Sequence, residues 1–481
     1  TFIGSTFMRY GESAPYKNTC IALGNCDDVE GSEPIIKCKT EKEVLLEWTR
    51  LIQREDPDMI IGYNIFGFDY RFMFERAKQN HCEEEFLMLS RNTDELCGNE
   101  DKDGRIRIEE TSIVIASGQH DLHYIKMNGR LQIDLYNYFR RDYNLTSYKL
   151  DYVAGNFIGD SVKKITQIEC NTEIQSKNLT GLLVGSFINF EEIGHSSEYY
   201  MEGKKFEVID VDKSTGRFTI EGNAQPDMET KKVKWGLAKD DVTPQDIFRM
   251  TNEGPSSKMV IAKYCIQDCN LVHYLLNKID VITGFIEMAK ICSVPMNFLV
   301  MRGQGIKLTS YIAKKCREKN TLMPDKEKIM NDGGYEGAIV LPPKSNLYLD
   351  NPVACVDYSS LYPSSMISEN LSHDSKVWTK EYDLNGELIK ETGEKHSETG
   401  EYVYDNLPEY EYVDVTYDTY KYVRKTPAAA ATKVISGYKV CRWAQFPNGG
   451  KAIMPSILEE LLAARKATRK QIPNQKDEFM K

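Results

Sequence analysis

Long apolar runs, cysteine pairs and histidines are scarce in this sequence of 481 residues. No apolar stretch approaches the roughly 18 residues that cross a bilayer, and no cationic segment followed by an apolar one opens the chain. We therefore expect no membrane partner and no secretory signal. The twelve cysteines form no CxxC pair and only seven histidines are present. This pattern predicts reduced thiols in an intracellular protein, rather than a disulfide framework or a zinc site.

Charge of either sign is plentiful, but the balance is acidic. The net charge is -11, with 28% charged and 41% hydrophobic residues, which is typical of a globular protein. A uniformly basic nucleic-acid coat is excluded, whereas a local basic groove is not. The end of the chain, from Arg465 to Lys481, carries six Lys or Arg against two acidic residues.

The length predicts about three domains, and the patterning changes along the chain. Thr40 and Glu43 form a capping-box pattern that predicts a helix through Glu55, followed by a turn and a short buried strand. Strand and helix signals alternating in this way favour an α/β layer with a mixed sheet. Residues 158–238 alternate with period two around a Lys-Ser-Thr-Gly turn, which predicts a β-rich insertion. Helical patterns dominate from residue 243 to about 319, and a last helix is expected from Ile457 to about Lys470.

The sharpest chemical feature is the segment VACVDYSSLYPSSMI, in which an apolar strand is expected to end in Asp357. A carboxylate at a strand end, beside exposed backbone carbonyls, is a hard oxygen ligand suited to Mg²⁺. An aspartate that merely caps the following helix is the alternative interpretation.

Asp357 to Ser364 resembles motif A (DxxSLYPS) of the family B replicative DNA polymerases, of the delta-like kind. Four further segments resemble motifs of that family in the family's order. They are Exo II (Asn64, Phe68 and Asp69), Exo III (Tyr264 and Asp268), the YxG(G/A) element (Tyr335, Gly337 and Ala338) and the triphosphate-binding start of the fingers (Arg465, Lys466 and Arg469). The segment NLTGLLVGSFINFEEIGHS resembles that of large nucleocytoplasmic DNA viruses.

The resemblance implies a polymerase site with two Mg²⁺ ions, held by Asp357 and the backbone carbonyl of Tyr358. The backbone amides from Ser360 through Leu361 to Tyr362 would face the incoming deoxynucleoside triphosphate. Tyr362 would lie beneath its sugar, where a ribose 2′-OH would clash with the ring. Arg465, Lys466 and Arg469 would bind the triphosphate, although the family usually has Lys in place of Arg469.

The resemblance also implies a 3′-5′ exonuclease site with two Mg²⁺ ions. Asp69 and Asp268 would be its metal-linked carboxylates, and Tyr264, one helical turn before Asp268, would orient the attacking water. Residues expected to contact DNA are Asn64 and Phe68, on the frayed single strand, and Tyr335 and Gly337, on the template backbone. Asp134 matches no motif of this chemistry, and we expect it to be structural.

Two parts of the family pattern are missing. Exo I (DxE) is expected before Thr1, and motifs B and C after Lys481. Asp28–Glu30 and Tyr417–Tyr420 imitate Exo I and motif C, but their contexts do not fit. The sequence is therefore expected to be an internal fragment that is inactive alone, from a full-length polymerase.

The predicted fold class is α/β and α+β multidomain. Its predicted parts are an RNase-H-like 3′-5′ exonuclease domain (1–300, with the β-rich insertion 158–238), a connector with the YxG(G/A) element (301–345), a partial polymerase palm (346–455, with a surface insertion 375–432) and the start of the fingers (456–481).

The predicted function is template-directed addition of dNMP to a primer 3′-OH, with proofreading, in DNA replication. Primer-template DNA and dNTPs are the expected partners, and a sliding clamp is a further candidate. The nucleus and a host cytoplasmic viral factory both stay open as locations. A nuclease-only protein and a non-catalytic DNA-binding scaffold derived from a polymerase are the alternatives, whereas Tyr362 conflicts with an RNA-polymerising enzyme.

Overall fold

The computed structural model describes residues 1–12, 14–115, 118–238, 243–323, 340–424, 426 and 432–475. The chain divides into two compact units, Thr1–Lys307 and Leu308–Lys481. Among the residues described, none of the helices combines the length and apolarity that a bilayer crossing requires.

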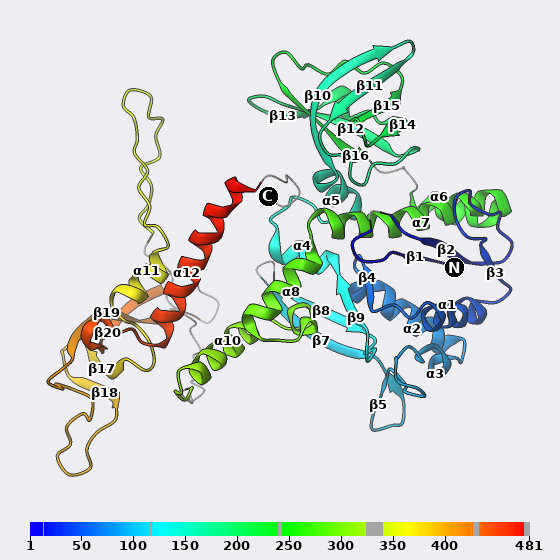
Figure 1. Ribbon diagram of the computed structural model, residues 1–481. Helices are drawn as coiled ribbons and strands as arrows, with labels where there is room; N and C mark the ends of the chain where they lie inside the picture. The colour runs from blue at the N-terminus through cyan, green and yellow to red at the C-terminus, as the bar shows by residue number, and fades with distance from the viewer. Residues whose placement is uncertain are drawn as a thin grey trace. The chain divides into compact units, whose positions relative to one another are not determined.

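The first half of unit 1 combines short strands with helices (Figure 1). Strand β1 pairs antiparallel with β2, and β2 pairs parallel with β3, while β4 and β9 form a separate parallel pair. Two small hairpins, β5–β6 and β7–β8, lie between β4 and β9 along the chain. The strands are β1 (Phe2–Phe7), β2 (Lys17–Leu23), β3 (Ile36–Cys38), β4 (Met59–Gly62), β5 (Asn99–Glu100), β6 (Ile106–Arg107), β7 (Glu109–Ile115), β8 (Gly118–Tyr124) and β9 (Leu131–Asp134). The helices are α1 (Glu41–Glu55), the π-helical turn η1 (Ile65–Asp69), α2 (Tyr70–Gln79), α3 (Glu83–Phe86), α4 (Leu135–Asp142) and α5 (Leu150–Phe157).

Helix α1 confirms the capping-box prediction. The Thr40 side chain accepts the backbone N–H of Glu43, and the Glu43 carboxylate accepts the N–H of Thr40. The apolar stripe of this helix, from Val44 through Trp48 to Ile52, is buried. Local capping and 3.6-residue periodicity therefore agree over this segment, which is why the sequence predicted it well.

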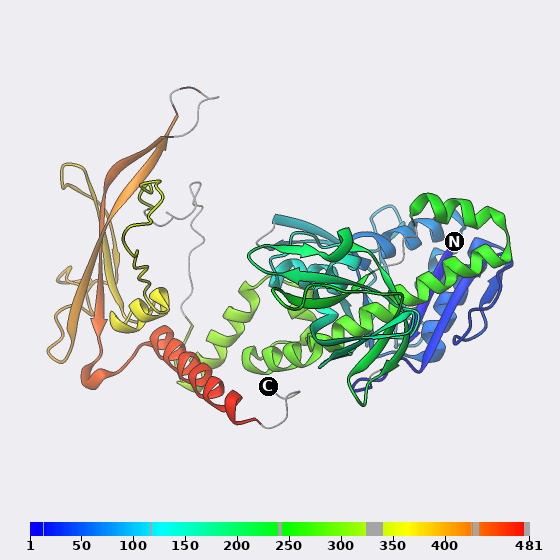
Figure 2. The ribbon, with the colours of Figure 1, turned by 90° about the horizontal axis from the view of Figure 1, so that it is seen from above.

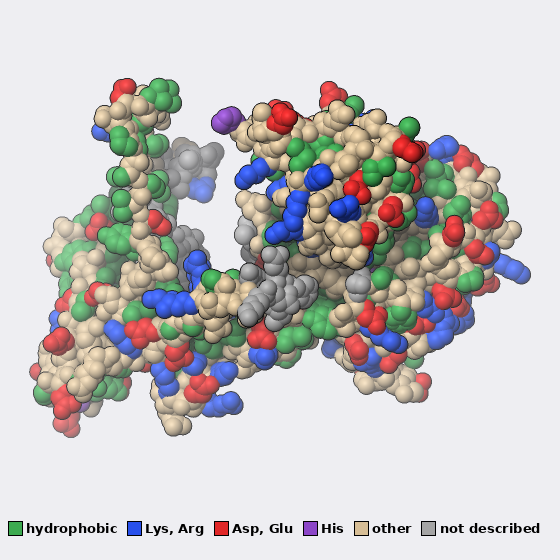
Figure 3. All heavy atoms as spheres, turned by 45° about the horizontal axis from the view of Figure 1, so that its top comes forward, with side chains coloured by type: hydrophobic (Ala, Val, Ile, Leu, Met, Phe, Trp, Pro, Cys, Tyr) green, Lys and Arg blue, Asp and Glu red, His purple; other side chains and the backbone are tan. Residues whose placement is uncertain are grey.

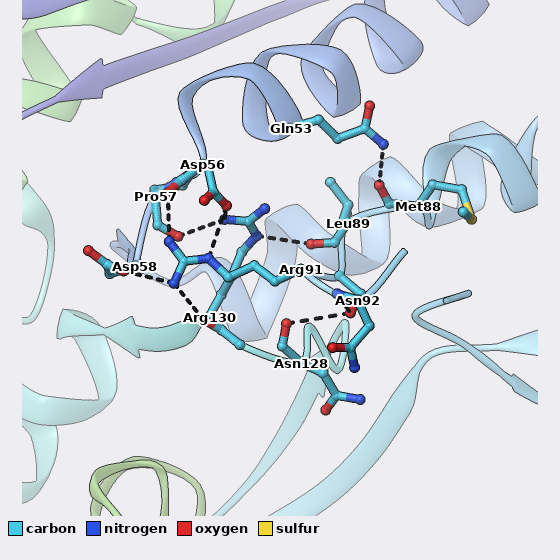
Figure 4. A network of polar contacts seen from close by, with 12 residues as sticks. Gln53, Asp56, Pro57, Asp58, Met88, Leu89, Arg91, Asn92, Asn128 and Arg130 are labelled. Atoms are coloured by element: carbon cyan, nitrogen blue, oxygen red, sulfur yellow. Dashed lines mark hydrogen bonds and ion pairs between the residues drawn. The ribbon is translucent and has the colours of Figure 1, made fainter. Parts of the chain in front are cut away.

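A buried arginine ties the start of β4 to the neighbouring loops (Figure 4). The Arg130 side chain is 2% exposed. It donates to the backbone carbonyls of Leu89, at 3.0 Å, and Pro57, at 2.7 Å, and to the Asp56 carboxylate, at 2.8 Å. Arg91 donates to the same carboxylate at 2.9 Å. These bonds lock the turn between α1 and β4, so the strand that leads into the Exo II segment begins from a fixed point.

Residues 159–238 form a closed β-barrel. Its antiparallel strands follow the order β12-β14-β15-β11-β10-β16, and β16 pairs back onto β12, with β13 added at one edge. Trp235, Phe190 and Phe218 fill the interior. The predicted hairpin around Lys-Ser-Thr-Gly is confirmed as β14–β15. The elements are β10 (Gly159–Ile168), β11 (Asn171–Ser176), β12 (Phe187–Ile193), β13 (Ser197–Tyr199), the short helix η2 (Tyr200–Gly203), β14 (Phe206–Asp212), β15 (Arg217–Glu221) and β16 (Lys232–Ala238).

The predicted helical stretch follows the barrel. Its helices are α6 (Pro244–Glu253), α7 (Pro255–Lys278), α8 (Val281–Cys292), α9 (Met296–Met301) and α10 (Gly305–Glu318). Helix α7 crosses strands β1 and β2 (Figure 2). A Cβ at Gly4 of β1 would lie 2.7 Å from the Sγ of Cys265, so only glycine lets the helix come this close.

Unit 2 is built on a four-stranded antiparallel sheet of order β18-β17-β20-β19, in which β19 and β20 form a long hairpin (Figure 2). Its elements are α11 (Leu361–Ser368), β17 (Lys376–Asp383), β18 (Leu388–Gly393), β19 (Glu411–Val423), β20 (Thr432–Gln445), η3 (Pro447–Gly449), α12 (Ile453–Gln471) and η4 (Ile472–Asn474). The expected last helix is therefore present and begins one turn earlier than predicted.

The prediction of a buried strand ending in Asp357 is wrong for this structure. Residues 352–358 form no strand, and Val353 and Val356 are 70% and 92% exposed. A β-strand needs a hydrogen-bonded neighbour, and no described residue pairs with this segment. An apolar pattern alone was not enough to make it a strand.

We expect Arg130→Ala to lower the free energy of unfolding by about 2–3 kcal/mol, because the buried Leu89 carbonyl and the half-buried Pro57 carbonyl lose their donor. Urea denaturation measures this loss. The matched control is Arg54→Ala, whose side chain is 53% exposed in ion pairs on the same unit, and it should change stability by less than about 0.5 kcal/mol. Equal stabilities of the two variants would contradict the anchoring role.

Candidate active sites

The Asp134 carboxylate organises the Exo II segment. It is 2% exposed and accepts the backbone N–H groups of Asn64, at 2.7 Å, and Phe66, at 3.0 Å. It also caps α4 by accepting the N–H of Tyr136 at 3.0 Å. The expectation that Asp134 is structural is confirmed by these bonds, which fix the turn leaving β4.

Burial raises the pKa of the Asp134 carboxyl to about 6, although its backbone hydrogen bonds favour the ionised form. A low-dielectric interior disfavours the charged carboxylate, and here that cost exceeds the benefit of the N–H donors.

The Exo II residues follow this turn within a few positions of one another. Asn64 adopts a left-handed conformation, with φ 65°, and Asp69 ends the π-helical turn η1. Burial raises the pKa of Asp69 to about 6, and the neighbouring Cys265 thiol of α7 adds to the shift. Phe68 is 58% exposed and stacks on Phe72, with ring centroids 5.5 Å apart. The pair presents an exposed aromatic surface, of the kind on which bases stack.

Tyr264 and Asp268 come together on one face of α7. Both line an open cavity of about 120 Å³, which residues of α5 and of the barrel also line. The structure thus brings the two predicted Exo III residues to one cavity, whereas Asp69 is not among the residues that line it.

A neighbouring face of α7 packs against β2 through cysteine side chains. Cys265 packs against a buried cluster that includes Cys20 and Ala22 of β2, and hydrogen bonds connect its thiol with those of Cys20 and Cys269. The twelve cysteines, which all lie within the described ranges, are reduced and form no disulfide. Cys265 of α7 therefore serves the packing of the helix against β2.

The motif A residues of unit 2 are exposed. Asp357 and Tyr358 lie in the irregular segment before α11, where Tyr358 is 79% exposed. Ser360 has φ 54° and precedes the helix, and Leu361 and Tyr362 form its first turn, exposed by 50% and 77%. The sequence predicted a strand, a turn and a helix in this order. The structure has the turn and the helix, but not the strand.

Helix α12 packs on α11 within unit 2. The buried Asn370 side chain connects them, since its Oδ1 accepts the N–H of Ala452 at 2.8 Å and its Nδ2 donates to the Ala444 carbonyl at 2.9 Å. Asp374 accepts the N–H of Ile453 at 3.0 Å and so caps α12. Farther along α12, the predicted triphosphate contacts are all exposed, namely Arg465, Lys466 and Arg469.

Tyr335, Gly337 and Ala338 lie outside the described residues. Within the part of the chain that the structure describes, no three His, Cys, Asp or Glu side chains gather closely enough to hold a metal ion. Lys and Arg side chains are interspersed with Asp and Glu on the visible face (Figure 3), which agrees with the absence of a uniformly basic coat.

Sequence reasoning missed several residues of the α7 cavity. Gln267, Asn270 and Leu271 also line it, and helical spacing from Tyr264 would have found Gln267 and Leu271. The barrel segment from Gly181 to Phe187 lines it too. The sequence related this segment to that of large nucleocytoplasmic DNA viruses, but gave it no role in the site.

Comparison with known proteins identifies the class. The exonuclease-domain description of DNA polymerase family B matches residues 2–153, and the DNA polymerase family B description matches residues 294–481. These stretches make up more than half of the chain and contain the Exo II and motif A residues. The chain belongs to DNA polymerase family B.

Individual relatives point the same way. The chain is 54% identical to a DNA polymerase of Phaeocystis pouchetii virus over 100% of its own length and 47% of the relative's. It is 40% identical to a DNA polymerase of Pyramimonas orientalis virus, over 98% of the chain and 34% of the relative. Identity to a DNA polymerase delta catalytic subunit of Oryza sativa is 27%, over 99% of the chain and 31% of that protein. The chain thus spans about half or less of the length of these relatives.

We expect the stability difference between wild type and Asp134→Asn to depend on pH. The pKa of Asp134 is raised on folding, so protonation favours the folded state. Its contribution is fully present below about pH 4 and is lost as pH rises through 6, which amounts to roughly 2–3 kcal/mol. Urea denaturation of both proteins between pH 4 and 8 measures the change.

Selective ¹³C labelling of aspartate carboxyls gives a direct check. The resonance that disappears in Asp134→Asn should titrate with a midpoint near pH 6. A midpoint near pH 4 would contradict the dominance of burial.

Proposed function

We propose that this chain carries the proofreading site and part of the polymerising site of a DNA-directed DNA polymerase. The reaction is template-directed addition of dNMP to a primer 3′-OH, accompanied by 3′-5′ removal of mispaired ends, in DNA replication. The observation that carries the proposal is the match of both a family B exonuclease domain and a family B polymerase domain to one chain.

The finer architecture belongs to the same proposal. Residues 1–300 act as an RNase-H-like exonuclease domain that holds the barrel, and residues 301–345 act as a connector. Residues 346–455 contribute to the palm, with 375–432 as a surface insertion, and residues 456–481 begin the fingers. The mixed β1-β2-β3 sheet and the parallel β4–β9 pair in unit 1 support the first assignment.

Mg²⁺ suits the donor set of both sites. Carboxylates are hard oxygen ligands, and Mg²⁺ is usually bound by one or two of them together with water and substrate phosphates. Asp69 and Asp268 would hold two ions in the exonuclease site, and Asp357 with the Tyr358 carbonyl would hold two in the polymerase site. Bound there, the ions would stabilise charge on the attacking and leaving oxygens of the phosphodiester.

The chain's own residues have distinct tasks in the exonuclease site. Tyr264 lies one turn from Asp268 and lines the same cavity, which supports the proposal that it would orient the attacking water. The exposed Phe68–Phe72 pair offers a stacking surface for a single strand, and Asn64 precedes it in a conformation that Asp134 fixes. Tyr335 and Gly337 complete this assignment as template-backbone contacts.

In the polymerase site, the amides of Ser360, Leu361 and Tyr362 and the cations of α12 would bind the dNTP. Arg465 and Arg469 are four residues apart on one helical face, and Lys466 adjoins them. The exposed ring of Tyr362 would exclude a ribose 2′-OH. Primer-template DNA is the macromolecular substrate, a sliding clamp is a candidate partner, and the proposed location is intracellular, in the nucleus or a viral factory.

The two carboxylate sites should be separable by mutation in the full-length protein that carries this sequence. Asp357→Ala should lower primer extension by at least about a thousandfold and leave 3′-5′ degradation intact, and Asp268→Ala should do the reverse. Each loss follows from removal of a metal-holding group. Gel assays with a labelled primer-template and a labelled single strand measure both activities.

Asp350→Ala, an exposed carboxylate near motif A, is the matched control and should retain both activities. Extension that survives Asp357→Ala would refute the polymerase assignment and favour a nuclease-only protein. A protein with neither activity before mutation would favour the non-catalytic scaffold.

We expect Tyr362→Ala to raise the ratio of ribonucleotide to deoxynucleotide incorporation by about tenfold or more, because the steric block to the 2′-OH is removed. Single-nucleotide extension with rNTP and dNTP measures the ratio. Tyr348→Ala, which removes an exposed tyrosine outside motif A, should leave it unchanged. An unchanged ratio for Tyr362→Ala would place sugar selection elsewhere.

A further inference from the structure

The β-barrel lies outside both stretches that match family B, which end at residue 153 and resume at residue 294. Neither of these two matches assigns a role to the barrel. Its position is specific, because one connecting segment of the barrel lines the cavity that holds Tyr264 and Asp268. This segment, Gly181–Phe187 between β11 and β12, is called the barrel loop below.

The barrel loop is held in a defined shape. The Gly185 N–H donates to the Val208 carbonyl at 2.7 Å, and the Val208 N–H donates to the Ser186 carbonyl at 2.8 Å. Gly181 has φ +86°, and a Cβ there would lie 2.9 Å from Ile158 and 3.4 Å from Tyr274. The loop is thus bonded to β14 at one end and packed against α7 at the other. The barrel loop is therefore a fixed wall of the cavity.

Two apolar side chains of this wall stay in solvent. Leu183 is 41% exposed and Val184 is 62% exposed, whereas the adjacent Leu182 is fully buried in the barrel. Both exposed residues line the same cavity as Asp268. Branched aliphatic side chains at this position offer an apolar surface on which a flat, uncharged ligand group can pack. They make no hydrogen bonds, and so they would not discriminate among the bases.

The side chain of Asn270 gives an independent indication that this cavity binds a ligand. It lines the cavity from α7, and its Oδ1 is buried and accepts no hydrogen bond from the described residues. A buried amide oxygen without a donor destabilises the fold, and a hydrogen bond from a ligand N–H or O–H would remove that cost. The cavity, at about 120 Å³, is well below the roughly 300 Å³ at which ligand pockets usually begin, and so suits a single planar group.

We propose that the barrel loop is one wall of the exonuclease site and seats the 3′-terminal deoxynucleotide of a single strand. Leu183 and Val184 pack on the terminal base, and the Oδ1 of Asn270 accepts a hydrogen bond from that nucleotide. Apolar contact with the base face accepts all four bases, as a proofreading site must. The inference rests on the proposed exonuclease function, to which it adds the positioning residues.

Degradation of single strands from the 3′ end tests the wall. In the full-length protein that carries this sequence, Leu183→Ser combined with Val184→Ser should lower the specificity constant kcat/KM about tenfold for each of the four terminal bases. Extension of a matched primer should not change. Ile209→Ser removes a side chain that is 40% exposed on the same barrel and does not line the cavity, so it should degrade DNA like wild type. A double variant that degrades single strands at the wild-type rate would overturn the inference.

Photocrosslinking gives a readout that does not depend on turnover. An oligonucleotide with 4-thiothymidine at its 3′ end, bound to the Asp268→Ala protein, should crosslink to the peptide containing residues 181–187. The same label placed ten nucleotides from the end should not. Crosslinks of the terminal label only to other peptides would overturn the assignment.

These experiments distinguish failure of the exonuclease proposal from failure of the role given to the barrel loop. Wild-type protein that degrades no single strand refutes the exonuclease proposal itself. Wild-type protein that degrades DNA, together with a double variant that does so equally well, refutes only the role of the barrel loop.

Discussion

The carboxylate of Asp134 sits where β4, β9, η1 and α4 meet, and it accepts backbone N–H groups from both sides of that junction. Asp134 is also the register partner of Gly62, the last residue of β4. The direction in which the chain leaves β4 is therefore decided by one buried side chain. The positions of Phe68 and Asp69 follow from that turn. The arrangement of the Exo II residues therefore depends on Asp134, which takes no part in the proposed chemistry.

Local signals explain the parts of the fold that the sequence predicted well. The capping box of α1, the β14–β15 hairpin and the α12 helix each depend on residues close together in the chain. The barrel was predicted only as β-rich, because its closure depends on the pairing of β12 with β16, about 40 residues apart. Such a contact leaves no periodic trace in the sequence.

The candidate sites show the same division. Motif letters identified Tyr264 and Asp268, and the fold brought both to one cavity. Asn270 and the loop from Gly181 belong to none of the five polymerase and exonuclease motifs, since what makes them relevant is a packing contact between α7 and the barrel. The error at residues 352–357 has a related cause. A continuous apolar run such as residues 352–356 describes a segment that can be buried, but only a neighbouring strand turns it into a β-strand.

The closure of the barrel has a consequence for how such a chain can change over time. Its first and last strands, β10 and β16, are hydrogen-bonded neighbours, with Gly159 opposite Gly236. The module therefore leaves and re-enters the host fold at almost the same point, and it exposes few unpaired strand edges that could recruit other chains. A unit with these properties can be gained, lost or exchanged between genes with little disturbance to the helices around it.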